Sequence, residues 1–191
     1  MRAIGSSNTP AVDIADAQWR SERRGLARFR TEQLPYSILN RGIENVVLPT
    51  TQRYGLGALV WGPLGQGMLT GRVRKGQQND LSRARYFKHL NDERRIDLVE
   101  QLVPLADEAG LPLTHLAMAF TIAHPGVTST LLGARTMEQL DDLLKGIGVA
   151  LTDDILDRID EIVPPGTDVT RLDQAYVSPP LLDPGLRRRP N

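Results

Sequence analysis

The chain of 191 residues contains no cysteine, which excludes disulfides, thiolate metal sites and a cysteine nucleophile. It has no excess of either charge, because 23 basic side chains are balanced by 23 acidic ones. Nothing in its composition therefore attracts it to nucleic acid or to an anionic membrane. No run of about 18 apolar residues and no signal-peptide pattern is present. These absences predict a soluble cytoplasmic protein with no nucleic-acid or membrane partner.

Strand patterns alternate with helix patterns along the chain. The predicted strands are residues 2–4, which Gly5 ends, then 29–33, 58–61 and 127–132. The predicted helices are 9–24, a short one ending at Tyr54, one around 96–106, 113–123, 136–145 and one from Thr152. The first has Thr9 as N-cap and an inner face of Val12, Ala15 and Trp19, flanked by Ala11, Ile14 and Gln18. Such alternation predicts right-handed βαβ units and a parallel sheet, covered on both faces. Four units form half of an eight-stranded βα barrel or a small doubly wound sheet.

Polar or aromatic residues follow three of the predicted strands. Ser7 and Asn8 follow the first, Gln33 ends the second and Trp61 ends the third. Ser, Asn and Gln offer the donors and acceptors that the carboxamide of a nicotinamide needs, and a flat aromatic side chain can stack on its ring. The alternative is structural: Ser7 and Asn8 shape a turn, Gln33 is a polar strand end and Trp61 belongs to the core.

Two further segments have the character of anion sites. Gly133-Ala134-Arg135 leads from the fourth strand into a helix capped by Thr136, where free N–H groups and the positive helix end favour an anion. An ordinary strand-to-helix connection explains the same residues. The long loop 62–90 is basic and could close over phosphates, although a solvated surface loop is the other explanation. Its basic residues are Arg72, Arg74, Lys75, Arg83, Arg85 and Lys88.

Taken together, the chain resembles the aldo-keto reductases, in particular the branch that includes the potassium-channel β-subunits. The resemblance is carried in family order by five segments: IGSSN (4–8), EQLPYSILNR (32–41), YGLGALVWGPLGQGMLTG (54–71), SRAR (82–85) and LLGARTMEQL (131–140). It covers residues 2 to about 164. It implies the C-terminal half of a (β/α)8 TIM barrel: four parallel βα units, extra helices and an irregular C-terminal tail. Residues 1–163 would form the partial reductase domain, and 164–191 the Pro-rich tail that borders the substrate pocket in this family.

The resemblance implies NADP(H) as cofactor and assigns roles to matching positions. Ser7, Asn8 and Gln33 would hold the carboxamide, and Trp61 would stack on the nicotinamide. The loop from Gly62 would follow the ribose and pyrophosphate, and the segment from Gly133 would bind the 2′-phosphate and adenosine. The implied cofactor residues are Ser7, Asn8, Gln33, Trp61, Gly62, Pro63, Leu64, Gly65, Gly67, Arg72, Arg83, Gly133, Arg135, Gln139 and Asp142. Leu143 departs from the family, since many relatives carry Asn there against the adenine.

A larger departure concerns catalysis. Aldo-keto reductases reduce a carbonyl with an Asp/Tyr/Lys/His tetrad from the first four barrel strands, and no residue here matches it. The tyrosines and histidines lie in loops, at helix ends or in the tail: Tyr36, Tyr54, Tyr86, Tyr176, His89, His115 and His124. No metal-ligand spacing is found, and no catalytic residue is assigned. Without its general acid the protein would lose about 100- to 10,000-fold in rate.

Three hypotheses follow. The chain is part of an NADP-dependent aldo-keto reductase, inactive or nearly so by itself. Alternatively, it is a half barrel that binds NADP or serves regulation without catalysis, and its exposed sheet edges pair with another copy or with a complementing barrel half. A truncated product or a misread frame would explain the missing strands, and we expect four strands with the tetrad to precede residue 1.

Overall fold

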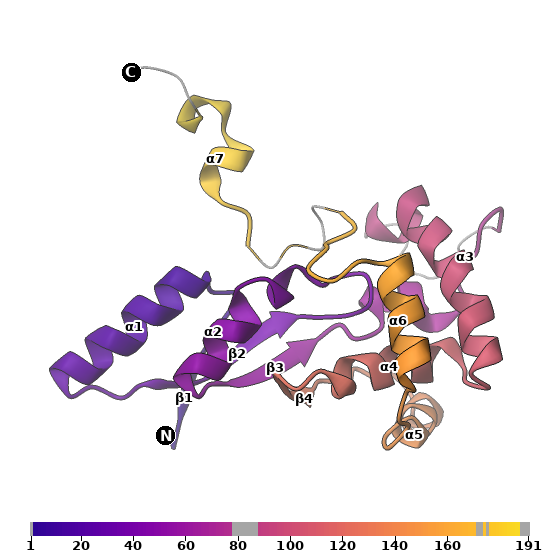
Figure 1. The fold of residues 1–191 in the computed structure, drawn as a ribbon, viewed down its shortest axis with the longest axis horizontal. Helices are drawn as coiled ribbons and strands as arrows, with labels where there is room; N and C mark the ends of the chain where they lie inside the picture. The colour runs from indigo at the N-terminus through magenta and orange to yellow at the C-terminus, as the bar shows by residue number, and fades with distance from the viewer. Residues whose placement is uncertain (1, 78–87, 171–173, 175, 188–191) are drawn as a thin grey trace.

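The computed structural model describes residues 2–77, 88–170, 174 and 176–187. Its sheet has four parallel strands in chain order: β1 (Ile4–Ser7), β2 (Phe29–Pro35), β3 (Gly57–Trp61) and β4 (Val127–Thr130). Each strand is followed by at least one helix (Figure 1). The fold class predicted from the sequence is confirmed, because four parallel βα units in order are a partial (β/α)8 barrel.

Seven α-helices are described, some joined by short 3-10 helices. The α-helices are α1 (Ala11–Arg24), α2 (Val47–Tyr54), α3 (Glu93–Glu108), α4 (Leu113–Ala123), α5 (Met137–Lys145), α6 (Asp153–Ile162) and α7 (Pro179–Leu182). The 3-10 helices are η1 (Gly42–Glu44), η2 (Gly65–Thr70), η4 (Lys88–Asn91) and η6 (Pro184–Leu186). The tail therefore contains short helical turns that its sequence did not indicate.

Local signals explain where most helices begin and end. Gly25 and Gly55 close α1 and α2 in the left-handed conformation, with φ of 63° and 65°. Thr136 and Thr152 cap α5 and α6, since the side chain of each accepts a hydrogen bond from the backbone N–H three residues on. The start of α1 differs from expectation. Pro10 is its N-cap, and the N–H of Thr9 before it donates to the carboxylate of Glu32 at 2.8 Å.

The buried face of α1 also differs from the prediction. Ile14 and Gln18 are buried, whereas Val12 and Trp19 are 72% and 55% exposed. Gln18 can be buried because both ends of its amide are bound: Nε2 donates to the carbonyl of Phe29 at 3.0 Å, and Oε1 accepts from Arg28 at 2.9 Å. The packing of α1 on α2 therefore selects a face that apolar spacing alone did not indicate.

Strand β1 is longer than expected, because Gly5 does not end it. Gly5 pairs with Thr31 of β2, and a Cβ on Gly5 would lie 2.1 Å from Thr31 Oγ1 and 2.8 Å from Thr31 O. The glycine thus permits close approach of two strands rather than a turn.

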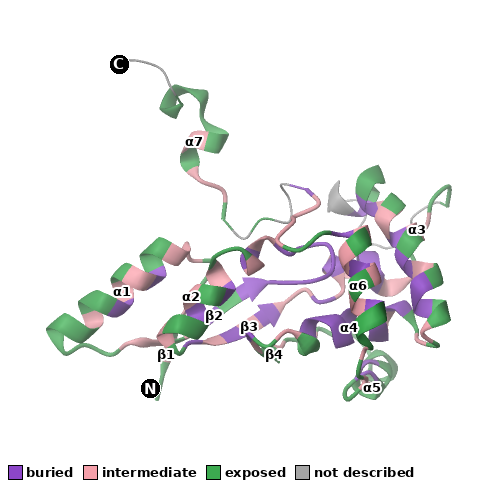
Figure 2. Ribbon diagram, in the orientation of Figure 1, coloured by how far each residue is buried: buried purple, intermediate pink, exposed green. Residues whose placement is uncertain are grey.

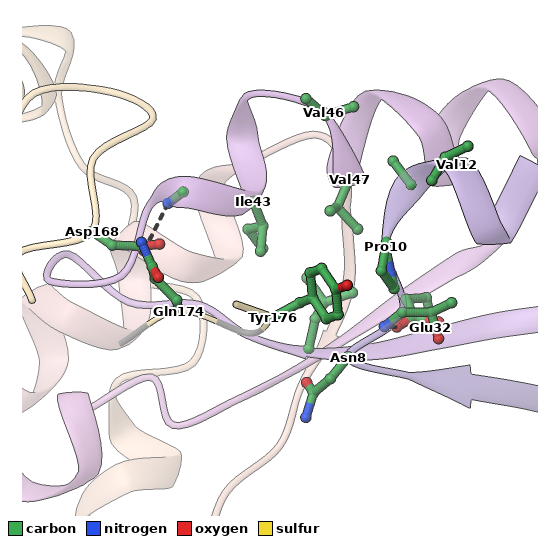
Figure 3. Close-up of a pocket in the computed structure, with 14 residues that line it drawn as sticks. Asn8, Pro10, Val12, Glu32, Ile43, Val46, Val47, Asp168, Gln174 and Tyr176 are labelled. Atoms are coloured by element: carbon green, nitrogen blue, oxygen red, sulfur yellow. Dashed lines mark hydrogen bonds between the residues drawn. The ribbon is translucent and has the colours of Figure 1, made fainter. Parts of the chain in front are cut away.

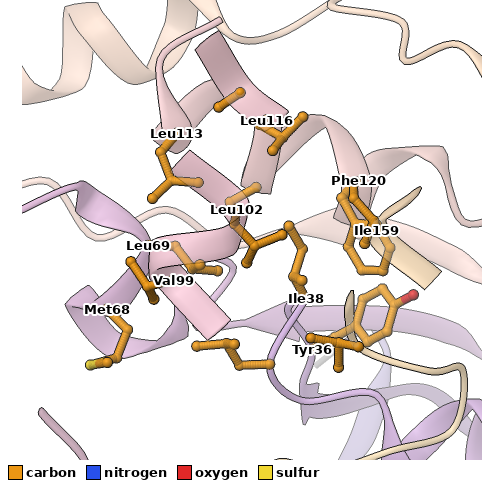
Figure 4. Packing of buried hydrophobic residues seen from close by; sticks show 14 of the residues in the cluster. Tyr36, Ile38, Met68, Leu69, Val99, Leu102, Leu113, Leu116, Phe120 and Ile159 are labelled. Carbon is orange, nitrogen blue, oxygen red and sulfur yellow. The ribbon is translucent and has the colours of Figure 1, made fainter. Parts of the chain in front are cut away.

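The two faces of the sheet differ in burial. Leu34, Ala58 and Val60 are buried in the core cluster together with side chains of α2, α3, α4 and η2. Figure 2 shows where buried positions lie along the chain, and Figure 4 shows the packing within this cluster. Gln33 is exposed, and Leu59 and Trp61 are half-buried on the alternate positions of the same strands. The expectation of a sheet covered on both faces is therefore wrong for the described residues, whose helices cover one face. No helix of the described part is long and apolar enough to cross a membrane.

Candidate functional site

Three polar side chains lie together at the carboxyl ends of β1 and β2. Ser7 pairs with Gln33 in the sheet, and the N–H of Asn8 donates to the carbonyl of Gln33 at 2.9 Å. All three residues are exposed, and within the described chain their side chains make no hydrogen bond. Asn8 has a left-handed φ of 52°, a conformation that Asn tolerates better than most residues. The arrangement leaves donors and acceptors of three side chains available to a ligand.

Trp61 and the loop after it continue this edge of the sheet. Trp61 pairs with Pro35, and its carbonyl accepts from the N–H of Tyr36 at 3.2 Å. The loop then turns through left-handed residues at Gly62, Gly65, Gln66 and Gly67. Asn8 and Gln66 are the two non-glycine residues with positive φ among those described, and both lie at this edge. Unusual backbone conformations of this kind gather at functional sites.

The core fixes the shape of the loop. Leu64, Met68 and Leu69 pack into the hydrophobic cluster, and a Cβ on Gly65 would lie 3.2 Å from Leu39. Two of its N–H groups are used inside the loop, since Gly65 donates to Gly62 O and Gly67 donates to Leu64 O. Pro63 is buried as well. A pyrophosphate along this loop would therefore meet a preformed backbone with part of its donors already bound.

The predicted anion segment forms the start of α5. Gly133 and Arg135 are exposed, and Thr136 Oγ1 accepts from Gln139 N at 3.3 Å. Gln139 Oε1 accepts from the N–H of Arg135 at 3.0 Å, so the capping residues bind two of the donors at this helix end themselves. Asp142 is exposed on the helix, and its carbonyl oxygen lies 2.9 Å from His115 Nε2.

Part of the basic loop binds to the protein itself. Arg74 makes two hydrogen bonds of 2.8 Å to the carboxylate of Glu100, and Lys75 Nζ lies 2.6 Å from Asp97. The hydrogen bonds from Arg74 lower the pKa of Glu100 to about 2. Both cations are thus neutralised by α3 rather than presented to a phosphate. Arg72 is exposed, and Arg83 lies outside the described residues.

A buried ionic cluster is centred on Arg41, in the loop after β2, and the sequence did not predict it. Arg41 Nε donates to Glu44 at 2.8 Å, and its Nη1 donates to Asp160 at 2.6 Å and to the carbonyl of Val163 at 2.7 Å. The Tyr36 hydroxyl donates to the same Glu44 oxygen at 2.7 Å. The spacing of Arg41 and Glu44 at i,i+3 was the available signal. The cluster ties the loop after β2 to the chain that follows α6.

This cluster also decides what Tyr36 can do. Burial and the hydrogen bond to Glu44 raise the pKa of Tyr36 far above its usual value, whereas a tyrosine general acid needs a lowered pKa. His124 contacts Tyr36 edge-on, and burial lowers its pKa. Its Nδ1 accepts from the N–H of Gly126. The Tyr36 hydroxyl and His124 Nδ1 are thus both engaged in hydrogen bonds within the protein.

A pocket of about 410 Å³ lies on the helical side of β1 and β2 (Figure 3). Pro10, Val12, Ile43 and Val47 line it, and Tyr176 from the tail covers it. The carboxylates at its wall are bound: Glu32 accepts from Ser6 Oγ and Thr9 N, and Asp168 accepts from Gly42 N at 2.9 Å. In Figure 3 the amide of Asn8 points away from these apolar side chains. Asn8 also belongs to the lining, so the pocket adjoins the polar residues that follow β1, and Gln174 and Tyr176 bring the tail to it.

The family model for the aldo/keto reductase family matches residues 1–164. The chain belongs to the aldo/keto reductase family. Members of this family use nicotinamide cofactors, in agreement with polar groups suited to a carboxamide at the strand ends. The resemblance stated from the sequence is therefore confirmed for nearly all the chain before its tail.

The relatives that the chain matches carry different names. The chain is 35% identical over 161 residues to an uncharacterized oxidoreductase, YrpG, of Bacillus subtilis, and the match covers 84% of this chain and 48% of that protein. A probable voltage-gated potassium channel subunit beta of Arabidopsis thaliana is 32% identical, with 83% and 51% covered. An NADH-specific methylglyoxal reductase of Escherichia coli is 31% identical, with 80% and 46% covered. The chain thus spans about half the length of the curated relatives it matches.

Proposed function

We propose that this chain supplies the nicotinamide-binding half of an NADP(H)-dependent aldo-keto reductase. The observation that carries the proposal is the edge at Ser7, Asn8 and Gln33, where three exposed side chains with no other partner in the described chain lie beside Trp61. A carboxamide needs acceptors for its NH2 group and a donor for its carbonyl, and these side chains offer both. The residues therefore fit the group that the family binds.

The remaining cofactor residues extend the same edge. The loop from Gly62 to Gly67 would follow the ribose and pyrophosphate, and Arg72 and Arg83 would reach the cofactor from the basic loop. Gly133, Arg135, Gln139 and Asp142 would hold the 2′-phosphate and adenosine. Arg135 gives the choice of NADP over NAD its physical basis, because a guanidinium pairs with a phosphate dianion and has no such partner on a 2′-hydroxyl.

When bound, the cofactor supplies a hydride for reduction of a carbonyl, the reaction of the family. The chain's own part is to hold the carboxamide and to stack Trp61 on the ring, which fixes the face of the nicotinamide presented to a substrate. Proton donation is a separate task for which the described residues offer no candidate. A catalytic tetrad from outside this sequence would complete the enzyme.

A second candidate is cofactor binding without catalysis, in a regulatory or interaction role. The hydrogen bond from Tyr36 to Glu44 favours it, because this buried hydroxyl is held as a structural donor. The two candidates share the binding site and differ only in turnover. Because the first candidate takes its tetrad from outside this sequence, the purified chain should be inactive under both, and NADPH-dependent reduction of a carbonyl after addition of a chain that carries the tetrad would decide for the first.

The binding site is tested by tryptophan fluorescence. In a Trp19→Phe variant Trp61 is the only tryptophan, so NADPH bound beside it is expected to quench the emission in a saturable way. In the Trp61→Phe variant the remaining Trp19 lies on α1 and should respond little. No quenching of Trp61 at millimolar NADPH would remove the proposal.

Specificity for the 2′-phosphate is tested with Arg135→Ala. We expect the affinity for NADPH to fall about tenfold while the affinity for NADH stays unchanged, since one charge-assisted contact is lost. Arg53→Ala, a change at an exposed arginine of α2, is the matched control. Equal affinities for NADPH and NADH in the parent chain would contradict the choice of NADP.

A further inference from the structure

Glu32 of β2 carries a fully buried carboxylate beside the proposed nicotinamide site, and it has no part in the cofactor contacts proposed above. Burial of a carboxylate is costly unless hydrogen bonds satisfy its oxygens. Both oxygens of Glu32 accept one. Oε2 accepts from Ser6 Oγ, and Oε1 accepts from the N–H of Thr9 at 2.8 Å. The buried charge is therefore stabilised by donors from the end of β1 and from the start of α1.

These two donors lie on either side of the Ser7-Asn8 segment. Ser6 comes directly before the segment and Thr9 directly after it, so one carboxylate joins both of its ends. Because the two oxygens of a carboxylate have a fixed separation, they also fix how far apart the two ends lie. Figure 3 shows Glu32 beside Pro10, where α1 begins, and the positive end of a helix favours a negative charge there.

Asn8 has a backbone conformation that requires such support. Its φ of 52° is left-handed, and an unfavourable conformation persists only where the surrounding contacts determine it. The N–H of Asn8 donates to the carbonyl of Gln33 at 2.9 Å, and the next N–H, that of Thr9, donates to Glu32. Two successive amides after β1 are therefore bound by two successive residues of β2.

The alternation of β2 sends its two residues to opposite faces, since Glu32 is buried and Gln33 is exposed. We infer that Glu32 is a positioning residue for nicotinamide binding: it holds the Ser7-Asn8 segment from the helical side, so that both side chains meet the carboxamide together with Gln33. A segment that is already ordered costs less to bind. The inference rests on the proposed function and adds to it a residue that touches no ligand.

Glu32→Met in the Trp19→Phe background tests the inference, because it removes both acceptors at a similar side-chain volume. We expect the Kd for NADPH, read from the quenching of Trp61, to rise about tenfold, as for the loss of one well-placed hydrogen bond in the complex. The affinity for adenosine 2′,5′-bisphosphate, which lacks the nicotinamide, should stay unchanged in calorimetry. Equal losses for the two ligands, as a merely structural role would give, or an unchanged affinity for NADPH would overturn the inference.

Three companion variants separate positioning from folding. Glu32→Gln keeps an acceptor for the N–H of Thr9 and should recover most of the affinity for NADPH. Ser6→Ala removes one of the two hydrogen bonds and should raise the Kd by a smaller factor than Glu32→Met, also if the latter does not fold. Glu44→Gln is the matched control, because it changes a carboxylate of the cluster around Arg41 and should leave the Kd unchanged. A Ser6→Ala chain that binds NADPH as the parent does would contradict the role of Glu32.

Amide exchange of the free protein reports on the segment without any cofactor. The amide of Thr9 should exchange faster in Glu32→Met than in the parent, because its acceptor is gone, whereas the amides of β3 should keep their rates. Equal rates for Thr9 would overturn the inference. A parent chain whose Trp61 is not quenched by NADPH would remove the proposed function, whereas equal quenching in the parent and in Glu32→Met would remove this inference alone.

Discussion

Neighbouring residues of β1 and β2 show how one step along a strand changes the role of a side chain. Ser6 and Glu32 face the helices, where Ser6 Oγ and the N–H of Thr9 bind the buried carboxylate. Ser7 and Gln33, one position further, are exposed on the opposite face. The alternation of a strand therefore separates a structural polar pair from a pair suited to a ligand.

The sequence predicted Ser7 and Gln33 as candidate ligand residues, and it did not indicate the bond between Ser6 and Glu32. Ser7 and Gln33 were predicted because the sequence placed them at strand ends, where ligands of α/β proteins bind. In the structure Ser7 ends β1, whereas β2 continues two residues beyond Gln33 to Pro35. The role of Glu32 depends on an N–H from the start of α1 and on its depth in the core, and neither is visible in local spacing. The cluster around Arg41 was not predicted either, because its partners lie up to 122 residues away in the chain.

Removal of the Arg41 guanidinium is predicted to destabilise the protein strongly. Arg41→Met removes the positive charge that pairs with the Glu44 carboxylate and the donor bound to the carbonyl of Val163, and the loss of one partner from a buried ionic cluster costs about 3–5 kcal/mol. Urea unfolding followed by circular dichroism measures the change. Arg20→Met, which removes an exposed pair with Asp16, should cost below about 1 kcal/mol. Equal losses in the two variants would show that the cluster contributes no more than a surface pair.

At the scale of elements, the sequence predicted where helices end better than it predicted which face of a helix is buried. The ends of α1 and α2 at Gly25 and Gly55 and the cap of α5 at Thr136 were found because a left-handed residue or a capping hydroxyl acts locally. The buried face of α1 was not predicted correctly, because packing against α2 and the hydrogen bonds of Gln18 decide it. Gly5 was wrongly taken as a strand end for a related reason. Its role is set by Thr31 on the neighbouring strand.

Gly5→Ala is therefore predicted to disturb the pairing of β1 with β2. The new Cβ would lie 2.1 Å from Thr31 Oγ1 and 2.8 Å from Thr31 O, and overpacking of this kind costs about 1–3 kcal/mol. Gly133→Ala is the control, because a Cβ there meets nothing within 4 Å. Thr31→Ala in the Gly5→Ala background should recover part of the loss, since it removes the hydroxyl but not the carbonyl. Urea midpoints measure all four proteins, and an unchanged midpoint for Gly5→Ala would contradict the argument.

At the scale of the whole molecule, the described sheet is open at both edges and on one face. The helices cover the face of Leu34, Ala58 and Val60, and Gln33, Leu59 and Trp61 lie on the other. Parallel sheets are ordinarily buried on both faces. The proposed cofactor site lies at one end of this uncovered face, so the surroundings of the nicotinamide depend on what closes the sheet.

Hydrogen exchange is predicted to separate the central strands from the edge strands. Amides of β2 and β3 are paired on both sides and should exchange slowest, because their opening requires disruption of the core. Amides on the outer edges of β1 and β4 have no partner strand among the described residues and should exchange faster. Mass spectrometry of peptides covering 2–10 and 125–132, compared with peptides of β2 and β3, measures the difference. Edge peptides that exchange as slowly as the central strands would contradict the expectation.

The sequence by itself determined the order of strands and helices, most of their ends, and the family motifs at the strand ends, because each of these depends on neighbours a few residues apart. Tertiary structure decided which face of α1 is buried, the ionic cluster that holds the chain after α6, and the pairing of Arg74 and Lys75 with α3. It also decided that one face and both edges of the sheet lie open among the described residues. These features arise from contacts between distant segments, and local periodicity carries no record of such contacts.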